Sequence, residues 1–281
     1  MPDAAQMWAA RLGDQDDDLS AVLRHVRVNR LPATRAAWAN SWQTREFLNL
    51  GLLILHEHQL QQGTSAQGDG VKLSSTLTPE NLANTAQLKV ADPDRASVLS
   101  VVRWKETWGH QAAYTEDLIA YLFRPGPQER RIATVREAVL VTDPDLPYAK
   151  YVRLATDALF QAAAEDPVLR LQQWIQAAIP GHPSVLTHAL RVDELSRELW
   201  TVILEKNMTA YGLTPKHGVT FADLAAAVRY AIAGLLLVRE PGTLPPAMAS
   251  GDSPLAAISL SLAAAYCDVT LDDLETRLPT I

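Results

Sequence analysis

The 281-residue sequence contains a single cysteine, Cys267, which excludes an internal disulfide and a thiolate zinc cluster and favours a reducing compartment. It also lacks the local motifs of nucleophilic hydrolases, zinc proteases and phosphate-binding glycine loops. The longest apolar run, residues 224–238, contains Arg229 and is too short to span a bilayer. The first residues have neither the basic nor the apolar region of a signal peptide. We therefore expect a cytoplasmic protein that is not an enzyme, with no catalytic residues, metal, cofactor or membrane association.

Positive charge is scarce overall but concentrated in one segment. The chain has 25 Lys and Arg against 32 Asp and Glu, a formal net charge of −7, which argues against a protein that coats nucleic acid evenly. Residues 19–46, however, contain one glutamate and several arginines, namely Arg24, Arg27, Arg30, Arg35 and Arg45. Such a segment is a weak indication of anion binding, and a solvated helix face explains the charge equally well.

Helical periodicity and helix-capping residues run through the chain. Asp166 and Pro167 precede a segment with apolar residues at helical spacing, and Thr220 and Thr270 are each followed three residues later by Asp. Alternating strand patterns bounded by hairpin turns are missing. The sequence therefore predicts an all-α fold.

Two breaks divide these helices. Residues 61–75 are polar and glycine-rich, and residues 124–127 read Arg-Pro-Gly-Pro. We expect two small helical units at residues 1–60 and 61–125, followed by a larger helical domain at residues 126–281.

A W-x-x-x-W pair occurs in each small unit, as Trp38 with Trp42 and as Trp104 with Trp108. In the first unit we expect a helix at 19–28, a turn at 29–31 and a second helix from Pro32. In the second we expect a helix at 78–88, a turn at 92–94 and a helix at 95–108. Thr44 and Thr115 are predicted to cap the next helix of each unit. Both units therefore have the order of a DNA-binding helix-turn-helix, and their tryptophans are expected in the core.

These features resemble the DNA-binding domain of TetR-type transcriptional regulators: an aromatic residue within the recognition helix, a short polar step, then an acidic and apolar helix. Residues 158–166 and 207–238 are similar to that family's C-terminal domain. The resemblance implies binding of double-stranded DNA, pairing as a homodimer, and a small apolar or amphipathic ligand. The chain departs from the family pattern in its doubled unit, in the missing turn glycine, and in having Trp where Tyr is usual.

Two groups of residues are the candidates for binding. The predicted DNA contacts, at the positions of the recognition helices and the basic segment, are Arg24, Arg27, Arg30, Thr34, Arg35, Arg95, Ser97, Ser100, Arg103 and Lys105. The predicted ligand contacts, amphipathic side chains of the C-terminal domain, are Trp174, His188, Trp200, Met208, Tyr211 and Tyr230. Exposed polar positions and ordinary core packing are the simpler explanations of the two groups.

The acidic total and the nearly neutral second unit favour an alternative function. In it, the chain is an all-helical protein-interaction module that keeps the helix-turn-helix form without binding DNA. A metal site at His56 and His58 is not expected, because side chains two residues apart on a helix point to different faces. The helix at 221–238 is apolar nearly all round, so we expect a second copy of the chain to cover part of it.

Overall fold

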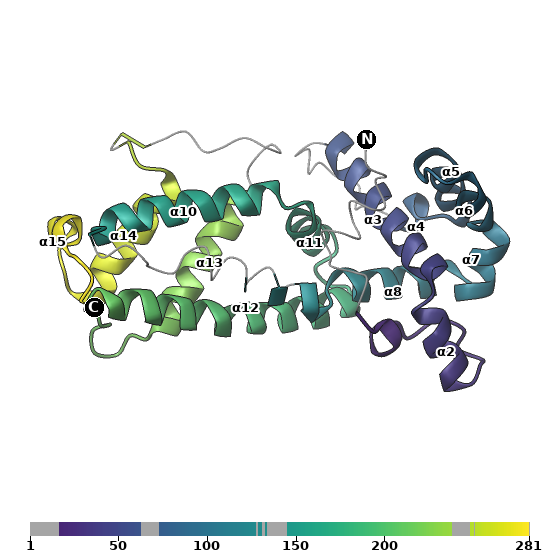
Figure 1. The fold of residues 1–281 in the computed structure, drawn as a ribbon, viewed down its shortest axis with the longest axis horizontal. Helices are drawn as coiled ribbons and strands as arrows, with labels where there is room; N and C mark the ends of the chain where they lie inside the picture. The colour runs from purple at the N-terminus through teal and green to yellow at the C-terminus, as the bar shows by residue number, and fades with distance from the viewer. Residues whose placement is uncertain are drawn as a thin grey trace. The chain divides into compact units, whose positions relative to one another are not determined.

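The computed structural model describes residues 17–62, 73–127, 129–130, 133, 145–237, 248–249 and 251–280. Every regular element within those ranges is a helix, which confirms the all-α prediction for them (Figure 1). In chain order the elements are η1 (Leu19–Ala21), α2 (Pro32–Ala39), α3 (Trp42–Gln62), α4 (Leu73–Thr76), α5 (Pro79–Lys89), α6 (Pro93–Val98), α7 (Val101–Trp108), α8 (Gln111–Leu122), α10 (Tyr148–Glu165), α11 (Pro167–Ala178), α12 (Pro183–Ala210), α13 (Phe221–Leu237), α14 (Pro254–Cys267) and α15 (Leu271–Thr276). Within the described part of the chain, no helix combines the length and apolarity needed to cross a membrane.

The chain folds as two compact units. Unit 1 comprises residues 1–127 and 171–191, and unit 2 comprises residues 128–170 and 192–281. The expected segments 1–60 and 61–125 both belong to unit 1, where α3 packs against α5 and α8. Helices α11 and α12 each contribute residues to both units, so the expected domain at 126–281 does not coincide with unit 2.

An aromatic cluster forms the core of unit 1 around α7 and α8. Trp104 and Trp108 are almost completely buried, and Tyr114 packs edge-on against both of their rings. The Tyr114 hydroxyl crosses to α3, where it donates a hydrogen bond of 2.7 Å to the Phe47 carbonyl. This close approach depends on Gly51, because a Cβ at that position would overlap the Tyr114 hydroxyl and lie 3.0 Å from Leu118 Cδ2.

Several helix starts agree with the capping prediction. The side chain of Thr270 accepts from the Asp273 N–H while Asp273 accepts in return, and Thr220 and Asp223 form the same reciprocal pair. The Asp166 carboxylate caps the start of α11. The predicted caps at Thr44 and Thr115 are wrong, because α3 and α8 begin earlier. Ser41 accepts from the Thr44 N–H, and His110 caps α8.

The predicted helix at residues 19–28 is also wrong. Only η1 forms there, and residues 22–30 continue as turns that we call the basic loop. The buried carboxylate of Asp117, on α8, accepts hydrogen bonds from the backbone N–H groups of Arg24 and His25. Arg27 has a φ of 47° and donates its N–H to the Thr107 carbonyl. The backbone N–H groups of Arg24, His25 and Arg27 therefore donate to α7 and α8, whereas in a continuous helix they would donate to carbonyls of that helix.

The chain breaks between α5 and α6 at residues 90–92, close to the turn predicted at 92–94, and it turns again at residues 99–100. Asp92 and Pro93 start α6 instead of forming a turn, since the Asp92 carboxylate accepts from the Asp94 and Arg95 N–H groups. The chain then leaves the helical conformation at Leu99, and the Ser100 side chain caps α7. The expected helix at 95–108 is thus two helices, α6 and α7, joined by a two-residue turn at 99–100.

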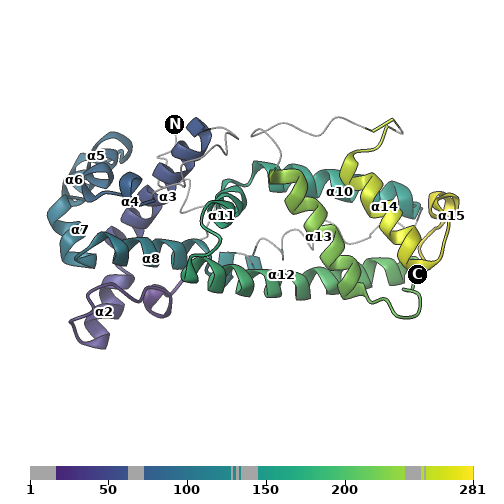
Figure 2. The ribbon, with the colours of Figure 1, turned by 180° about the vertical axis from the view of Figure 1, so that it is seen from behind.

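Unit 2 is built around α10, α13 and α14, with the second half of α12 alongside (Figure 2). Its main core includes Tyr148, Met208, Tyr211 and Leu224. Arg153 on α10 binds Asp252, which precedes α14, and Glu275 on α15, at 2.6 and 2.5 Å. These ion pairs connect α10 to the segment before α14 and to α15.

Candidate functional sites

Helices α5, α6 and α7 of unit 1 occupy the segment for which the second helix-turn-helix is predicted, and α5 packs against both of the others. Trp104, Thr107 and Trp108 point into the core. The exposed side of α7 carries Val102, which is 68% exposed, together with Lys105 and Glu106. A DNA groove would therefore meet one apolar, one positive and one negative side chain on this helix.

Trp38 of α2 is stacked between two arginines from distant parts of the chain. The guanidinium of Arg27 lies 3.8 Å from the centroid of the indole, and that of Arg103 lies 4.2 Å from it. Both guanidiniums also approach the carboxylate of Glu106, at 3.7 and 3.1 Å. We call Arg27, Trp38, Arg103 and Glu106 the Trp38 cluster. It joins the basic loop, α2 and α7, and it carries a net positive charge of two cations against one anion.

Other predicted DNA contacts lie next to this cluster. Arg35 donates a hydrogen bond of 2.8 Å to the Arg24 carbonyl, so α2 and the basic loop are neighbours. Arg24, Arg30, Thr34 and Lys105 are exposed. In the sequence of the basic loop, α2 and α7, Glu106 is the only carboxylate, against the cations Arg24, Arg27, Arg30, Arg35, Arg103 and Lys105. Cations of the two sequence units meet at Trp38, where Arg27 and Arg103 stack on the same indole.

The remaining predicted DNA contacts serve local structure. Arg95 stacks on Trp42 and pairs with Glu46 at 3.7 Å. The Ser97 hydroxyl donates to the Asp94 carbonyl, and Ser100 caps α7.

The four tryptophans of the repeated pairs differ in exposure. Trp104 is 1% exposed, whereas Trp42 is 36% exposed and Trp38 is half-buried. The expectation that all four belong to the core is therefore wrong for the first pair. The physical reason is that Trp38 and Trp42 pack against guanidiniums instead of aliphatic side chains, and a cation stacked on an indole stabilises it without full burial.

Asp117 of α8 connects the basic loop to α7. Besides the two backbone N–H groups, its carboxylate accepts a hydrogen bond of 3.1 Å from the Trp108 indole. Burial raises the pKa of Asp117, while the hydrogen bonds from Arg24 and His25 act in the opposite direction. One side chain thus sets the position of the loop relative to α7. Sequence reasoning missed Asp117, because its partners lie 92 and 93 residues away in the chain.

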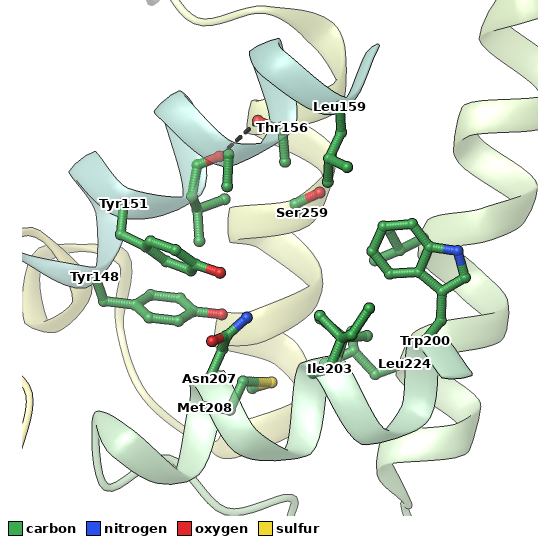
Figure 3. A pocket seen from close by; sticks show the side chains of 14 residues that line it. Tyr148, Tyr151, Thr156, Leu159, Trp200, Ile203, Asn207, Met208, Leu224 and Ser259 are labelled. Carbon is green, nitrogen blue, oxygen red and sulfur yellow. Dashed lines mark hydrogen bonds between the residues drawn. The ribbon is translucent and has the colours of Figure 1, made fainter. Parts of the chain in front are cut away.

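Unit 2 contains a pocket with a cavity volume of about 60 Å³. Its walls come from α10, α12, α13 and α14 and are mostly aliphatic and aromatic (Figure 3). The residues that line it are Tyr148, Tyr151, Val152, Ala155, Thr156, Leu159, Trp200, Ile203, Leu204, Asn207, Met208, Leu224, Val228 and Ser259. A space of this size holds a few water molecules or one small group.

The predicted ligand contacts are divided between several environments. Trp200 and Met208 line the pocket, and Tyr211 lies behind Tyr148 and Tyr151, with ring centroids 5.1 and 5.8 Å away. Tyr230 is 66% exposed on α13.

Trp174 and His188 belong to unit 1 and do not line this pocket. The Trp174 ring packs edge-on against His58, with centroids 6.3 Å apart. His188 is half-buried, and burial lowers its pKa. The charges of Arg24 and Arg191 act in the same direction, and Glu116 opposes them.

Sequence reasoning missed the tyrosines of α10 and the serine of α14. Tyr148 and Tyr151 are three residues apart, and this spacing places them on one helix face. Nothing local to Ser259 distinguishes it from other helix serines. Among the described residues, no group of three His, Cys, Asp or Glu side chains could hold a metal ion.

No known protein-family model matches the chain, and comparison with curated proteins and with solved structures gave no significant match.

Proposed function

We propose that the protein is a TetR-like transcriptional regulator that binds double-stranded DNA through unit 1 and responds to a small ligand in unit 2. The observation that carries the proposal is the Trp38 cluster beside helices α6 and α7, where a helix-turn-helix is predicted. Cations from two segments about 75 residues apart, Arg27 and Arg103, are brought to one indole at the edge of α7. Positive side chains beside an exposed helix of this kind are what phosphate contact needs.

The exposed cations next to the cluster are the best candidates for phosphate contact. Arg30 of the basic loop and Lys105 of α7 have exposed side chains and no ion pair among the described residues. Arg27, Arg35 and Arg103 already bind Glu106 or a backbone carbonyl, so their role is to hold the surface together. Substituting Arg30 or Lys105 should therefore affect DNA binding more selectively than substituting Arg35.

A gel-shift titration against the promoters of its own and neighbouring genes, over a series of salt concentrations, tests the proposal. Removing one cation that binds a phosphate should flatten the slope of log affinity against log salt by about 0.9 units. We expect this for Arg30→Ala and Lys105→Ala. Lys150→Ala, an exposed lysine on α10 of unit 2, is the matched control and should leave the slope unchanged.

Glu106→Gln gives a second test of opposite sign. Glu106 is exposed at 45% of its side chain and places negative charge on the outer side of α7. Its removal should strengthen DNA binding, because the carboxylate repels phosphate and competes for Arg27 and Arg103. Absence of salt-sensitive binding in the unaltered protein, or weaker binding by this variant, contradicts the proposal.

The alternative is an all-helical protein-interaction module. It is favoured by the exposed apolar side chains beside the same helices, since Val28, Leu31 and Val102 are 53%, 76% and 68% exposed. In that case Glu106→Gln changes no DNA affinity because there is none. Replacing Leu31 with Asp would then be the variant that abolishes binding of a partner protein.

A further inference from the structure

The pocket of unit 2 has a chemical character that limits what it can bind. None of the described residues that line it carries a charge. Burial raises the pKa of Tyr148 and of Tyr151, so both phenols are neutral hydrogen-bond donors near pH 7. A charged ligand would give up its hydration here without meeting an opposite charge.

Ser259 supplies the polar group that gives the pocket a direction. Its side chain extends from α14 toward the space between α10 and α12 (Figure 3). The residue is 9% exposed, and its hydroxyl has no hydrogen-bond partner within the described part of the chain. A buried hydroxyl without a partner destabilises a fold, so this group is matched to a partner that the chain itself does not provide.

A neighbouring hydroxyl in the same pocket makes the contrast clear. Thr156 on α10 donates to the Val152 carbonyl of its own helix at 2.6 Å, which is the usual way in which a helical hydroxyl is satisfied. Ser259 is also on a helix but does not make this bond. The free hydroxyl therefore reflects the environment of Ser259 and not a general property of hydroxyls in this unit.

We propose that this pocket binds a small uncharged molecule of only a few non-hydrogen atoms, whose oxygen acceptor takes the hydrogen bond of the Ser259 hydroxyl. The remaining walls, which include Trp200, Ile203 and Met208, contact its apolar body. The cavity of about 60 Å³ sets the size. The assignment of this molecule as an effector depends on the proposed function, whereas its chemical class depends only on the pocket.

Three small probes of similar size and shape separate the chemical requirements: acetone is neutral with an acceptor, isobutene is neutral without one, and acetate is anionic. Met208 provides a local signal, because it lines the pocket and is one of four methionines in the chain. We would label the methionine methyl groups of the full chain with ¹³C and assign the Met208 resonance with Met208→Leu. Titration of each probe then gives an affinity from the shift of that resonance.

The expected order of affinity is acetone, then isobutene, with acetate at least about tenfold weaker than acetone. Ser259→Ala should weaken acetone binding by about fivefold and change isobutene binding by less than about twofold, since this variant removes only the hydroxyl that donates to the acceptor. Ser261→Ala, an exposed serine on the same helix, is the matched control and should change neither affinity.

Equal affinity for acetone and acetate overturns the proposal, as does an unchanged acetone affinity in the folded Ser259→Ala variant. Absence of any Met208 shift at saturating probe concentrations also overturns it. The gel-shift titration is done on the same preparations, so the two proposals fail separately. DNA binding without probe binding removes only the ligand class, and probe binding without DNA binding removes only the regulator.

Discussion

Gly51 should tolerate no side chain, because α3 and α8 approach each other at this residue. An added Cβ would overlap the Tyr114 hydroxyl and lie 3.0 and 3.2 Å from the two methyl groups of Leu118. In Gly51→Ala the Tyr114 ring must shift. The shift breaks its hydrogen bond to the Phe47 carbonyl and disturbs its edge-on packing with Trp104 and Trp108.

The magnitude follows from three contributions. Alanine gains about 1 kcal/mol over glycine in a helix. Overpacking costs about 2 kcal/mol, and breaking a buried hydrogen bond so that its hydroxyl is left unsatisfied costs about 2 kcal/mol more. We therefore expect Gly51→Ala to lower the free energy of unfolding of unit 1 by about 3 kcal/mol.

A double-mutant cycle tests the cause. Tyr114→Phe alone should cost about 1 kcal/mol, since it removes the hydroxyl and its hydrogen bond together. The double variant should cost about 2 kcal/mol instead of the additive value of about 4, because the atom that clashes most with the new Cβ is gone. Some cost remains from Leu118.

Urea unfolding followed by tryptophan fluorescence measures these changes. The chain has seven tryptophans, and by sequence position only Trp200 belongs to unit 2, so the signal reports mainly on unit 1. Gly234→Ala is the control, because no atom of the described residues lies within 4 Å of a Cβ added there. This variant should raise the stability of α13 by about 1 kcal/mol, and its unfolding is followed by circular dichroism. Strict additivity in the cycle, or a Gly51→Ala variant as stable as the parent, would refute this packing argument.

Three further predictions follow from individual side chains. Asp117→Asn replaces an acceptor oxygen with an amide nitrogen, so it should lower the free energy of unfolding by about 2–3 kcal/mol. It should also speed amide hydrogen exchange at Arg24 and His25. The control, Asp157→Asn at an exposed position, should change neither quantity. Burial lowers the pKa of His188 in the folded protein below its unfolded-state pKa of about 6.5. The stability that depends on neutral His188 is therefore complete above about pH 6.5, and it is lost as the pH falls toward the lower pKa of the folded state. Urea midpoints of unit 1 at pH 7.5 and 5.5 should therefore fall less in His188→Gln than in the parent, and an equal fall would contradict this. A second copy of the chain should cover the exposed side of α13 around Tyr230, so light scattering should give a mass of about twice the 30.8 kDa of one chain. The Tyr230→Glu variant should have the mass of one chain. If the parent protein already has the mass of one chain, the dimer is excluded.

The parts of the fold that could be predicted from sequence are those decided by neighbours in the chain. Thr270 and Asp273 are three residues apart, so the chemistry that starts α15 is complete within one turn. The same is true of Asp166 and the start of α11. Helix type and helix starts of this kind need no information about the rest of the molecule.

The basic loop could not be predicted in this way. Residues 19–28 have the pattern of a helix, and the competing acceptor, Asp117, stands on another helix more than 90 residues later. The pocket of unit 2 is a similar case, because Tyr151, Asn207 and Ser259 come from three helices and share no local pattern. Long-range contacts decide both features, and local sequence patterns do not display them.

Trp38 shows why the candidate DNA-binding face was only partly visible in the sequence. The repeated W-x-x-x-W spacing treats Trp38 and Trp104 as equivalent, but the structure surrounds one with guanidiniums and the other with aromatic rings. A guanidinium stacked on an indole uses its flat face and keeps its charge, so Arg27 and Arg103 can stabilise α2 against α7 and still contribute positive potential. Glu106 withdraws part of that potential, since it binds both arginines at once. Charge counts along the sequence give the sign of this surface, whereas its strength depends on how Arg27 and Arg103 divide their contacts between Glu106 and an approaching phosphate.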